Sequence, residues 1–382
     1  MEIKNIIGLV IVVIFSISTI TTSALGTFDY NSETEPVSPL ITNKSIPYQG
    51  QLRIYIVEKE SRWSDNSGTP YHFGFLDYAF DDKISIDYQE TYNNKIMWKG
   101  DISEDNVIVM AAIFNQQATL GYSNPSFEKP FEAYAVDAST STTPGNIGYN
   151  TVTEDFTHTV FIEEATVSWC PDCPAMAETL YDIYQTNDYP FIYVALIGDM
   201  NPIAEPRYLD DYNLWGYPTG YFDGGKELLV GGILDEFPYR SRIEYSGQKD
   251  VHELNLSLSV DWIGNGEIEI DIAISNNEEI TIPIYEFGDV NGGLNSVSTT
   301  ISNVGAEDVN DVEWNIHIKG GLLDLLHSHT EGSIETLSVD NKEIIQSKDP
   351  IFGFGKADII ISANTAVTVE KGFVLGPLVS IL

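Results

Sequence analysis

The stretch Trp169-Cys170-Pro171-Asp172-Cys173-Pro174 holds both cysteines of this 382-residue chain. The C-x-x-C spacing allows a local, reversible disulfide, and the loop that it closes is too short to restrict the unfolded chain appreciably. A zinc site is the alternative, but zinc needs about four ligands, and the sequence offers no other cysteine and only the lone His158 nearby. The motif therefore favours redox chemistry over metal binding.

The residues around the motif predict a strand followed by a helix. Residues 159–167 are mainly β-branched and apolar, which is typical of a strand. Residues 171–186 begin with a proline, which suits the first helical position, and carry apolar side chains at helical spacing. Cys170 would then lie at a helix N-terminus, where the dipole favours a thiolate. We therefore expect Cys170 to be the attacking nucleophile and Cys173 the resolving thiol.

Together with the sequence that follows, this arrangement resembles the thioredoxin superfamily. Residues 191–197 form the continuous apolar run of a buried central strand, and residues 216–225 are similar to the family's cis-proline loop. The resemblance implies that Pro218 packs against the disulfide and that Tyr217 offers backbone groups to the substrate chain. It also implies that Glu164 shuttles a proton for the resolving cysteine. An ordinary turn proline and a solvent-facing carboxylate are the alternatives for Pro218 and Glu164.

Other residues near the motif affect the expected chemistry and surface of the site. Alternation along the strand places Glu163 and Glu164 on opposite faces, so only one of the two can serve the cysteines. Asp172 lies between the cysteines, where its charge disfavours a neighbouring thiolate, so we expect the attacking thiol to be only moderately acidic. Trp169 and Trp215 would flank the disulfide and shape a substrate groove.

Beyond residues 156–248, which the resemblance covers, the chain predicts β-sandwich modules. Short alternating strands separated by turn signals precede and follow this stretch. The expected fold class is therefore a multidomain chain with an α/β thioredoxin-like domain flanked by all-β, immunoglobulin-like sandwich modules. The predicted divisions are a signal peptide (1–24), a linker (25–47), a β-sandwich module (48–136), a second linker (137–155), the thioredoxin-like domain (156–248), a β-hairpin (249–283) and a C-terminal sandwich (284–382). The hairpin strands at 254–275 are expected to complete the N-terminal sandwich.

The N-terminus predicts export. Residues 6–20 are nearly all apolar and small residues follow, which is typical of a secretory signal cleaved after Ala24. An uncleaved anchor is the alternative, although the apolar run is short for a membrane span. The formal net charge of −38 argues against nucleic acid or an anionic membrane as partner. The layout resembles exported thioredoxin-domain proteins of outer-membrane or archaeal type, so we expect a secreted or cell-surface protein.

These features predict an exported thiol–disulfide oxidoreductase that acts on protein thiols and disulfides and uses no cofactor and no metal. An unidentified electron donor or acceptor would be its second partner. The alternative is a surface binding or adhesion protein in which the redox domain is a scaffold and the disulfide is inert. His327 and His329 could bind a metal with Asp324 or Glu331, but their spacing matches no known metal motif. The direction of electron flow does not follow from the sequence.

Overall fold

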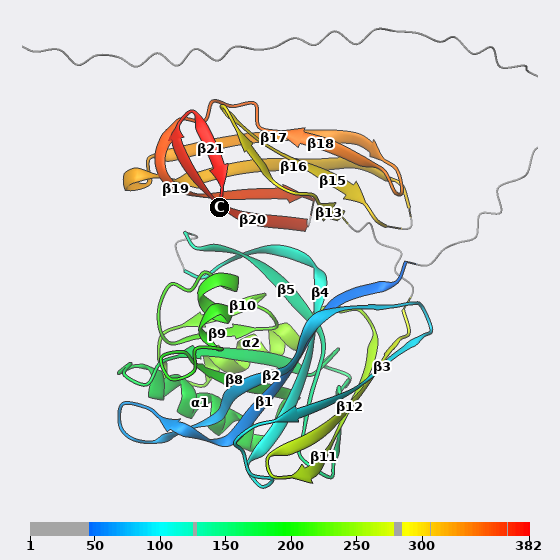
Figure 1. Ribbon diagram of the computed structural model, residues 1–382, viewed down its shortest axis with the longest axis vertical. Helices are drawn as coiled ribbons and strands as arrows, with labels where there is room; N and C mark the ends of the chain where they lie inside the picture. The colour runs from blue at the N-terminus through cyan, green and yellow to red at the C-terminus, as the bar shows by residue number, and fades with distance from the viewer. Residues whose placement is uncertain (1–45, 125–127, 279–284, 306, 365) are drawn as a thin grey trace, which may run out of the picture. The chain divides into compact units, whose positions relative to one another are not determined.

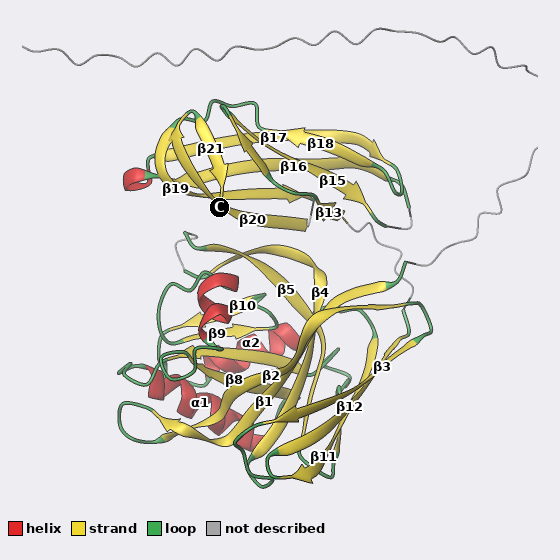
Figure 2. Cartoon of the chain, in the orientation of Figure 1, coloured by secondary structure: helices red, strands yellow, loops and turns green. Residues whose placement is uncertain are grey.

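The computed structural model describes residues 46–382, except for 125–127, 279–284, 306 and 365. The predicted signal peptide and nearly all of the first linker lie outside the described residues. Most of the described residues are in strands (Figure 2), and the two α-helices among them are α1 (Cys173–Thr186) and α2 (Phe237–Gly247). Within this part of the chain, no helix has both the length and the apolar character needed to cross a membrane.

An eight-stranded sheet contains the strands on either side of the cysteines (Figure 1). Its strand order is β10-β9-β7-β8-β2-β1-β4-β5. β7 and β8 are parallel, and both are buried along their whole length, which explains their continuous apolar sequence. The strand bounds are β1 (Tyr48–Ser64), β2 (Pro70–Ile86), β4 (Val107–Tyr122), β5 (Pro130–Thr142), β7 (Val160–Thr166), β8 (Phe191–Ile197), β9 (Thr219–Phe222) and β10 (Glu227–Val230).

A second sheet joins strands from before and after the cysteine segment. Its order is β3-β12-β11-β6, and its strands are β3 (Thr91–Lys99), β6 (Ile147–Tyr149), β11 (Leu254–Gly264) and β12 (Glu267–Asn276). Alternate residues of β11 and β12 are buried. Among them, Leu258 and Ile270 share one apolar core with Ile54 of β1 and Val109 of β4. The hairpin β11–β12 therefore packs back onto strands from the beginning of the described chain.

The predicted fold class, an α/β thioredoxin-like domain flanked by separate all-β modules, is wrong. The described chain is mostly β, and its strands at 160–230 do not form a sheet of their own. β2 continues the sheet beside β8, with Gly74 opposite Ala195, so strands from both regions share one sheet. The edge of β8 carries backbone groups that need partners. The local residue pattern shows that β8 is buried, but it does not identify the distant strand that covers this edge.

The C-terminal residues form two further sheets around a separate apolar core. Val297, Ile316 and Ile359 contribute to this core, and the alternating polar residues of β16, including His317, lie on the opposite face of its sheet. One sheet contains β13 (Tyr285–Phe287), β14 (Asn291–Gly293), β15 (Ser296–Asn303) and β18 (Lys342–Gln346). The other, in the order β17-β16-β19-β20-β21, contains β16 (Val309–Gly320), β17 (Leu326–Leu337), β19 (Gly353–Ala363), β20 (Ala366–Gly376) and β21 (Leu378–Ile381).

Candidate functional site

Cys170 and Cys173 lie between the end of β7 and the beginning of α1, and they form a disulfide. The helix begins at Cys173 with Asp172 as its N-cap, so it starts two residues later than the sequence predicted. Pro174, rather than Pro171, occupies the first turn, where a missing N–H is harmless. The backbone N–H of Cys173 donates to Cys170 Sγ at 3.1 Å. After reduction, the same N–H would stabilise a thiolate at Cys170.

The two sulfurs differ in their access to solvent. Cys170 is 3% exposed and Cys173 is completely buried. Both pack with Val167 and with the half-buried Tyr217. Both cysteines are thus buried, and of the two only Cys170 has any exposed surface.

The loop that precedes β9 contributes Tyr217 and Pro218. The peptide bond between these two residues is cis, and Pro218 is buried. The Tyr217 ring contacts the ring of Trp169 edge-on, with centroids 6.1 Å apart, and the ring of Tyr208 at 5.7 Å. Trp169 is 64% exposed and Trp215, in the same loop as Tyr217, is 54% exposed. Aromatic surface is thus available beside the disulfide.

Asp199 is a residue of this region that the sequence reasoning missed. Its carboxylate accepts the backbone N–H of Ser168 at 2.8 Å and the Ser168 hydroxyl at 2.5 Å. These two bonds fix the turn that carries Trp169 and Cys170. Asp199 comes two residues after the end of the buried strand β8, and the parallel strands β7 and β8 end at the same edge of the sheet. The position of Asp199 just after a buried strand is the sequence feature that could have predicted its place beside the cysteine turn.

Glu164 of β7 faces the layer that contains α1. Its neighbour on β8 is Ala195, which packs with Ala177 of α1. A side chain at Gly220, its neighbour on β9, would also contact Met176 of α1, with Cβ 3.6 Å from that sulfur. Glu164 therefore lies beneath the helix whose first residue is Cys173.

The Glu164 carboxyl is buried in an unusual state. It has no exposed surface, and neither of its oxygens has a hydrogen-bond partner among the described residues. Burial raises the pKa of Glu164 to about 8, so the carboxyl is mainly protonated at neutral pH. The hydroxyl of Tyr193, two positions from Ala195 on the same strand face, is likewise buried without a partner in the described structure. A solvent-facing role for Glu164 does not fit this burial.

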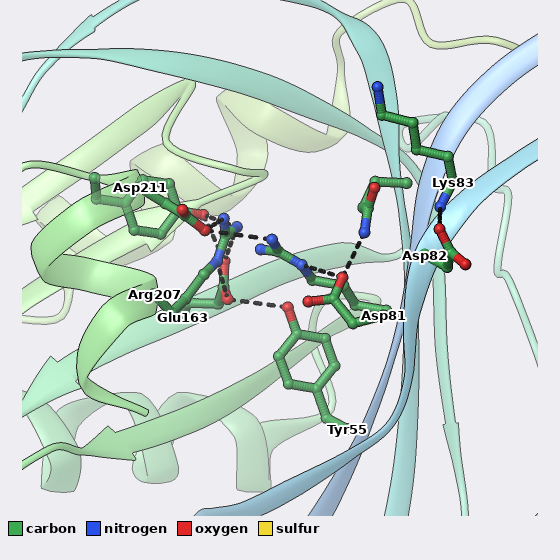
Figure 3. Close-up of polar contacts among 10 residues, drawn as sticks. Tyr55, Asp81, Asp82, Lys83, Glu163, Arg207 and Asp211 are labelled. Carbon is green, nitrogen blue, oxygen red and sulfur yellow. Dashed lines mark hydrogen bonds and ion pairs between the residues drawn. The ribbon is translucent and has the colours of Figure 1, made fainter. Parts of the chain in front are cut away.

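Glu163, the adjacent residue, lies on the other face in a network of charges (Figure 3). Arg207 donates to both Glu163 oxygens, from Nε at 2.8 Å and from Nη2 at 2.7 Å. The hydroxyls of Tyr55 and Tyr212 also donate to this carboxylate. Burial alone would raise the pKa of Glu163, but the Arg207 guanidinium outweighs burial and holds that pKa below its ordinary value. Of the two carboxyls, only Glu164 can exchange a proton near neutral pH.

Among the described residues, no cluster of metal ligands surrounds the sulfurs. Within the described residues, one group of acidic side chains has its oxygens close enough together to hold a metal ion. It consists of Asp261, Glu269 and Asp271, on β11 and β12. Lys95 Nζ contacts Glu269 at 2.6 Å and Asp271 at 3.1 Å. Its ammonium group already pairs with two of these three carboxylates, so we assign no metal to them.

Comparisons with known proteins do not identify the site, so it is interpreted from its chemistry. The chain matches no protein family, no characterised protein and no solved structure. The resemblance that the motif suggests stays a prediction. The residues that the structure brings together around the disulfide are Trp169, Cys170, Cys173 and Tyr217, with Pro218 next in the chain and Glu164 beneath α1.

Proposed function

We propose that this protein is a thiol–disulfide oxidoreductase that exchanges disulfides with polypeptides through Cys170 and Cys173. The observation that carries the proposal is the combination of this short-range disulfide with a buried, unpartnered carboxyl under the same helix. A disulfide that closes so short a loop contributes little to stability, because it removes little entropy from the unfolded chain. Reversible thiol–disulfide exchange would account for both the short-range disulfide and the buried carboxyl.

Cys170 is the attacking group in this proposal. Its thiolate, held by the Cys173 N–H, attacks one sulfur of a substrate disulfide, and the other substrate sulfur leaves as a thiolate. Cys173 then loses its proton and attacks Cys170 Sγ, which forms the internal disulfide and releases the second substrate thiolate. Two electrons pass from the dithiol to the substrate. In the opposite direction, a substrate dithiol attacks Cys170 and leaves the protein reduced.

Glu164 is the proton carrier for Cys173. Its pKa of about 8 lies close to the value of about 8.5 that is usual for a thiol. A proton therefore passes between the two groups with little change in free energy. The ionised carboxyl accepts the Cys173 proton when the mixed disulfide is resolved, and the protonated carboxyl returns it when Cys173 leaves as a thiolate. The position of Glu164 beneath α1 supports this role.

The substrate class is a polypeptide with an accessible disulfide or thiol. Trp169 offers exposed aromatic surface beside Cys170, and Trp215 offers more in the loop of Tyr217, which favours an apolar chain segment over a small polar thiol. Tyr217 lies between this surface and the disulfide, and its backbone is available for the chain to align against. A second partner must supply or accept the two electrons, since the cysteines return to their starting state in each cycle.

The first experiment is reduction of insulin by the dithiol form of the protein. We expect turnover by the wild type and none by Cys170→Ser or Cys173→Ser, with the fold of each variant checked by circular dichroism. A wild-type protein that reduces insulin no faster than the free dithiol reagent would show that the disulfide is inert. The protein would then be better described as a surface binding protein that uses this fold as a scaffold.

We further propose that the protein acts outside the cytoplasm. The support is the apolar stretch at residues 6–20, which lies outside the described residues, together with a C-x-x-C pair that an oxidising compartment would keep cycling. Expression in a host that secretes proteins, followed by mass determination of the exported chain, tests this. A chain retained in the cytoplasm with its N-terminus intact would contradict it.

A further inference from the structure

Three of the six histidines in this chain lie on one face of one sheet, far from the cysteines in sequence. His317 of β16 is directly opposite His329 of β17, and His327 lies two positions from His329 along β17. The two strands are neighbours (Figure 1). Side chains that are opposite each other, or two positions apart, project from the same face of a sheet. The cysteine chemistry gives this cluster no role.

The rings of His317 and His329 are already close together. Their centroids are 5.7 Å apart, and their planes are nearly perpendicular at 89°. Two nitrogens that bind one zinc-like ion each lie about 2.0–2.1 Å from it, so they are separated by at most about 4 Å. A shared ion would therefore require a change of rotamer at His329, whose side chain is exposed.

Two further groups can complete such a pair. Glu331 lies two positions beyond His329, and its Oε2 is 3.7 Å from His329 Nε2. His327 is exposed, and its Nε2 lies 3.0 Å from the backbone carbonyl of Asp324. Glu331 can therefore join with little adjustment, whereas His327 must first leave its present partner. The cluster offers two central nitrogens and two outer ligands.

Charged groups lie on both sides of the central pair. Lys319 lies opposite His327 rather than opposite the central pair, and Asp358 in the same row is paired with Lys371 at 2.7 Å. The central pair is flanked on the other side by the carboxylate of Glu331.

We propose that His317 and His329 are the main ligands of a surface site for a divalent transition-metal ion of the Cu²⁺, Ni²⁺ and Zn²⁺ class, with Glu331 and His327 as additional ligands. Imidazole nitrogens favour these ions over Mg²⁺ and Ca²⁺, which prefer oxygen. This proposal departs from the sequence-based expectation of no metal. That expectation considered only the spacing within residues 324–331 and could not include the histidine on the neighbouring strand.

The test is titration of the whole protein with Cu²⁺, in parallel with Mg²⁺, by calorimetry in a non-coordinating buffer at pH 7.5. The Cys170–Cys173 disulfide is kept intact, so that thiolates cannot bind the metal. We expect one saturable Cu²⁺ site whose electron paramagnetic resonance spectrum shows coupling to nitrogen and which excess Mg²⁺ does not displace. Binding should weaken at pH 5.5, because protons compete for the imidazoles. Absence of a saturable, nitrogen-coupled site would overturn the proposal.

Variants locate the site. Loss of even an outer partner of a metal ligand typically reduces affinity about 10–100-fold, so His329→Ala should weaken Cu²⁺ binding by roughly ten-fold or more. The double variant with His317→Asn should lose the nitrogen coupling, and circular dichroism confirms that each variant is folded. His72→Gln, in a different sheet, is the matched control and should bind as the wild type does. Equal affinity in the wild type and the double variant, or an equal loss in the control, would contradict the assignment.

Discussion

Replacement of Glu164 by Gln tests the buried carboxyl through the pH dependence of stability. The pKa of this group rises from 4.5 to about 8 on folding, because the carboxyl is wholly buried. The unfolded chain therefore releases its proton from about pH 4.5 upward, while the folded chain keeps its proton until about pH 8. Each unit between these values removes about 1.4 kcal/mol from the free energy of unfolding. The contribution of Glu164 to the free energy of unfolding is therefore most favourable at low pH, and its loss is complete above about pH 8.

The magnitude follows from the interval that is measured. Between pH 5 and pH 7 the wild type should lose about 2–3 kcal/mol of unfolding free energy through this group alone. Glu164→Gln has no such loss, because the amide does not titrate and contributions from all other groups cancel in the comparison. The difference in stability between variant and wild type should therefore change by about 2–3 kcal/mol in favour of the variant. Urea denaturation of both proteins at pH 5, 6 and 7, with the disulfide intact, measures it.

The result that would refute this reasoning is a constant difference between the two proteins across that range. Glu164 would then be ionised in the folded protein, and a proton carrier with a pKa near that of a thiol would not exist. If the difference changes as expected, the exchange rate should also fall in Glu164→Gln near neutral pH, because Cys173 has lost its proton acceptor. A normal exchange rate together with the expected stability change would leave Glu164 as a buried carboxyl without a catalytic role.

Three further perturbations have defined outcomes. Cys173→Ser should accumulate mixed disulfides with substrate proteins on non-reducing gels and Cys170→Ser should not; equal trapping would reverse the order of attack. Glu163→Gln should destabilise the protein by up to about 3–5 kcal/mol in urea at pH 7, because it leaves the buried Arg207 with only the exposed Asp211 as a charged partner; a loss below about 1 kcal/mol would contradict the ion-pair assignment. His158 is buried and hydrogen-bonded to Asp223 at 3.0 Å. Burial lowers the pKa of His158, but the opposing effect of the Asp223 carboxylate is larger, so the pKa lies above 6.5. The pair should thus stabilise the wild type fully below pH 6.5 and lose this contribution as pH rises through the raised pKa; thermal unfolding of Asp223→Asn should lack this dependence, and parallel curves for the two proteins would argue against it.

The strand and helix around the cysteines could be predicted because local pattern determines them. Residues 159–167 are apolar and β-branched, and the structure has β7 at Val160–Thr166. The helix start was placed too early, since Pro171 and Pro174 both suit a first turn and only tertiary context selects the second. Alternation gave the two glutamates different faces, but the sequence around Arg207 carried no sign that its guanidinium would be buried against one of them.

The arrangement of the sheets could not be predicted in the same way. The pairing of β2 with β8 joins residues 74 and 195, and no local pattern encodes a contact over such a distance. The same limit applies to the histidines. The H-S-H sequence at 327–329 was visible, whereas the register that sets His317 opposite His329 depends on how β16 and β17 align.

The shared sheet also has a consequence for how this chain can be divided. β8, which follows the cysteines, pairs with β2 on one side, and the hairpin β11–β12 packs on strands that precede the cysteines. A fragment limited to residues 156–248 would lack β2, so one edge of β8 would have no neighbouring strand. It would also lack the hairpin β11–β12 and the strands on which that hairpin packs. The segment that carries Cys170 and Cys173 therefore shares its sheet with its flanks and is unsuited to transplantation as an independent unit.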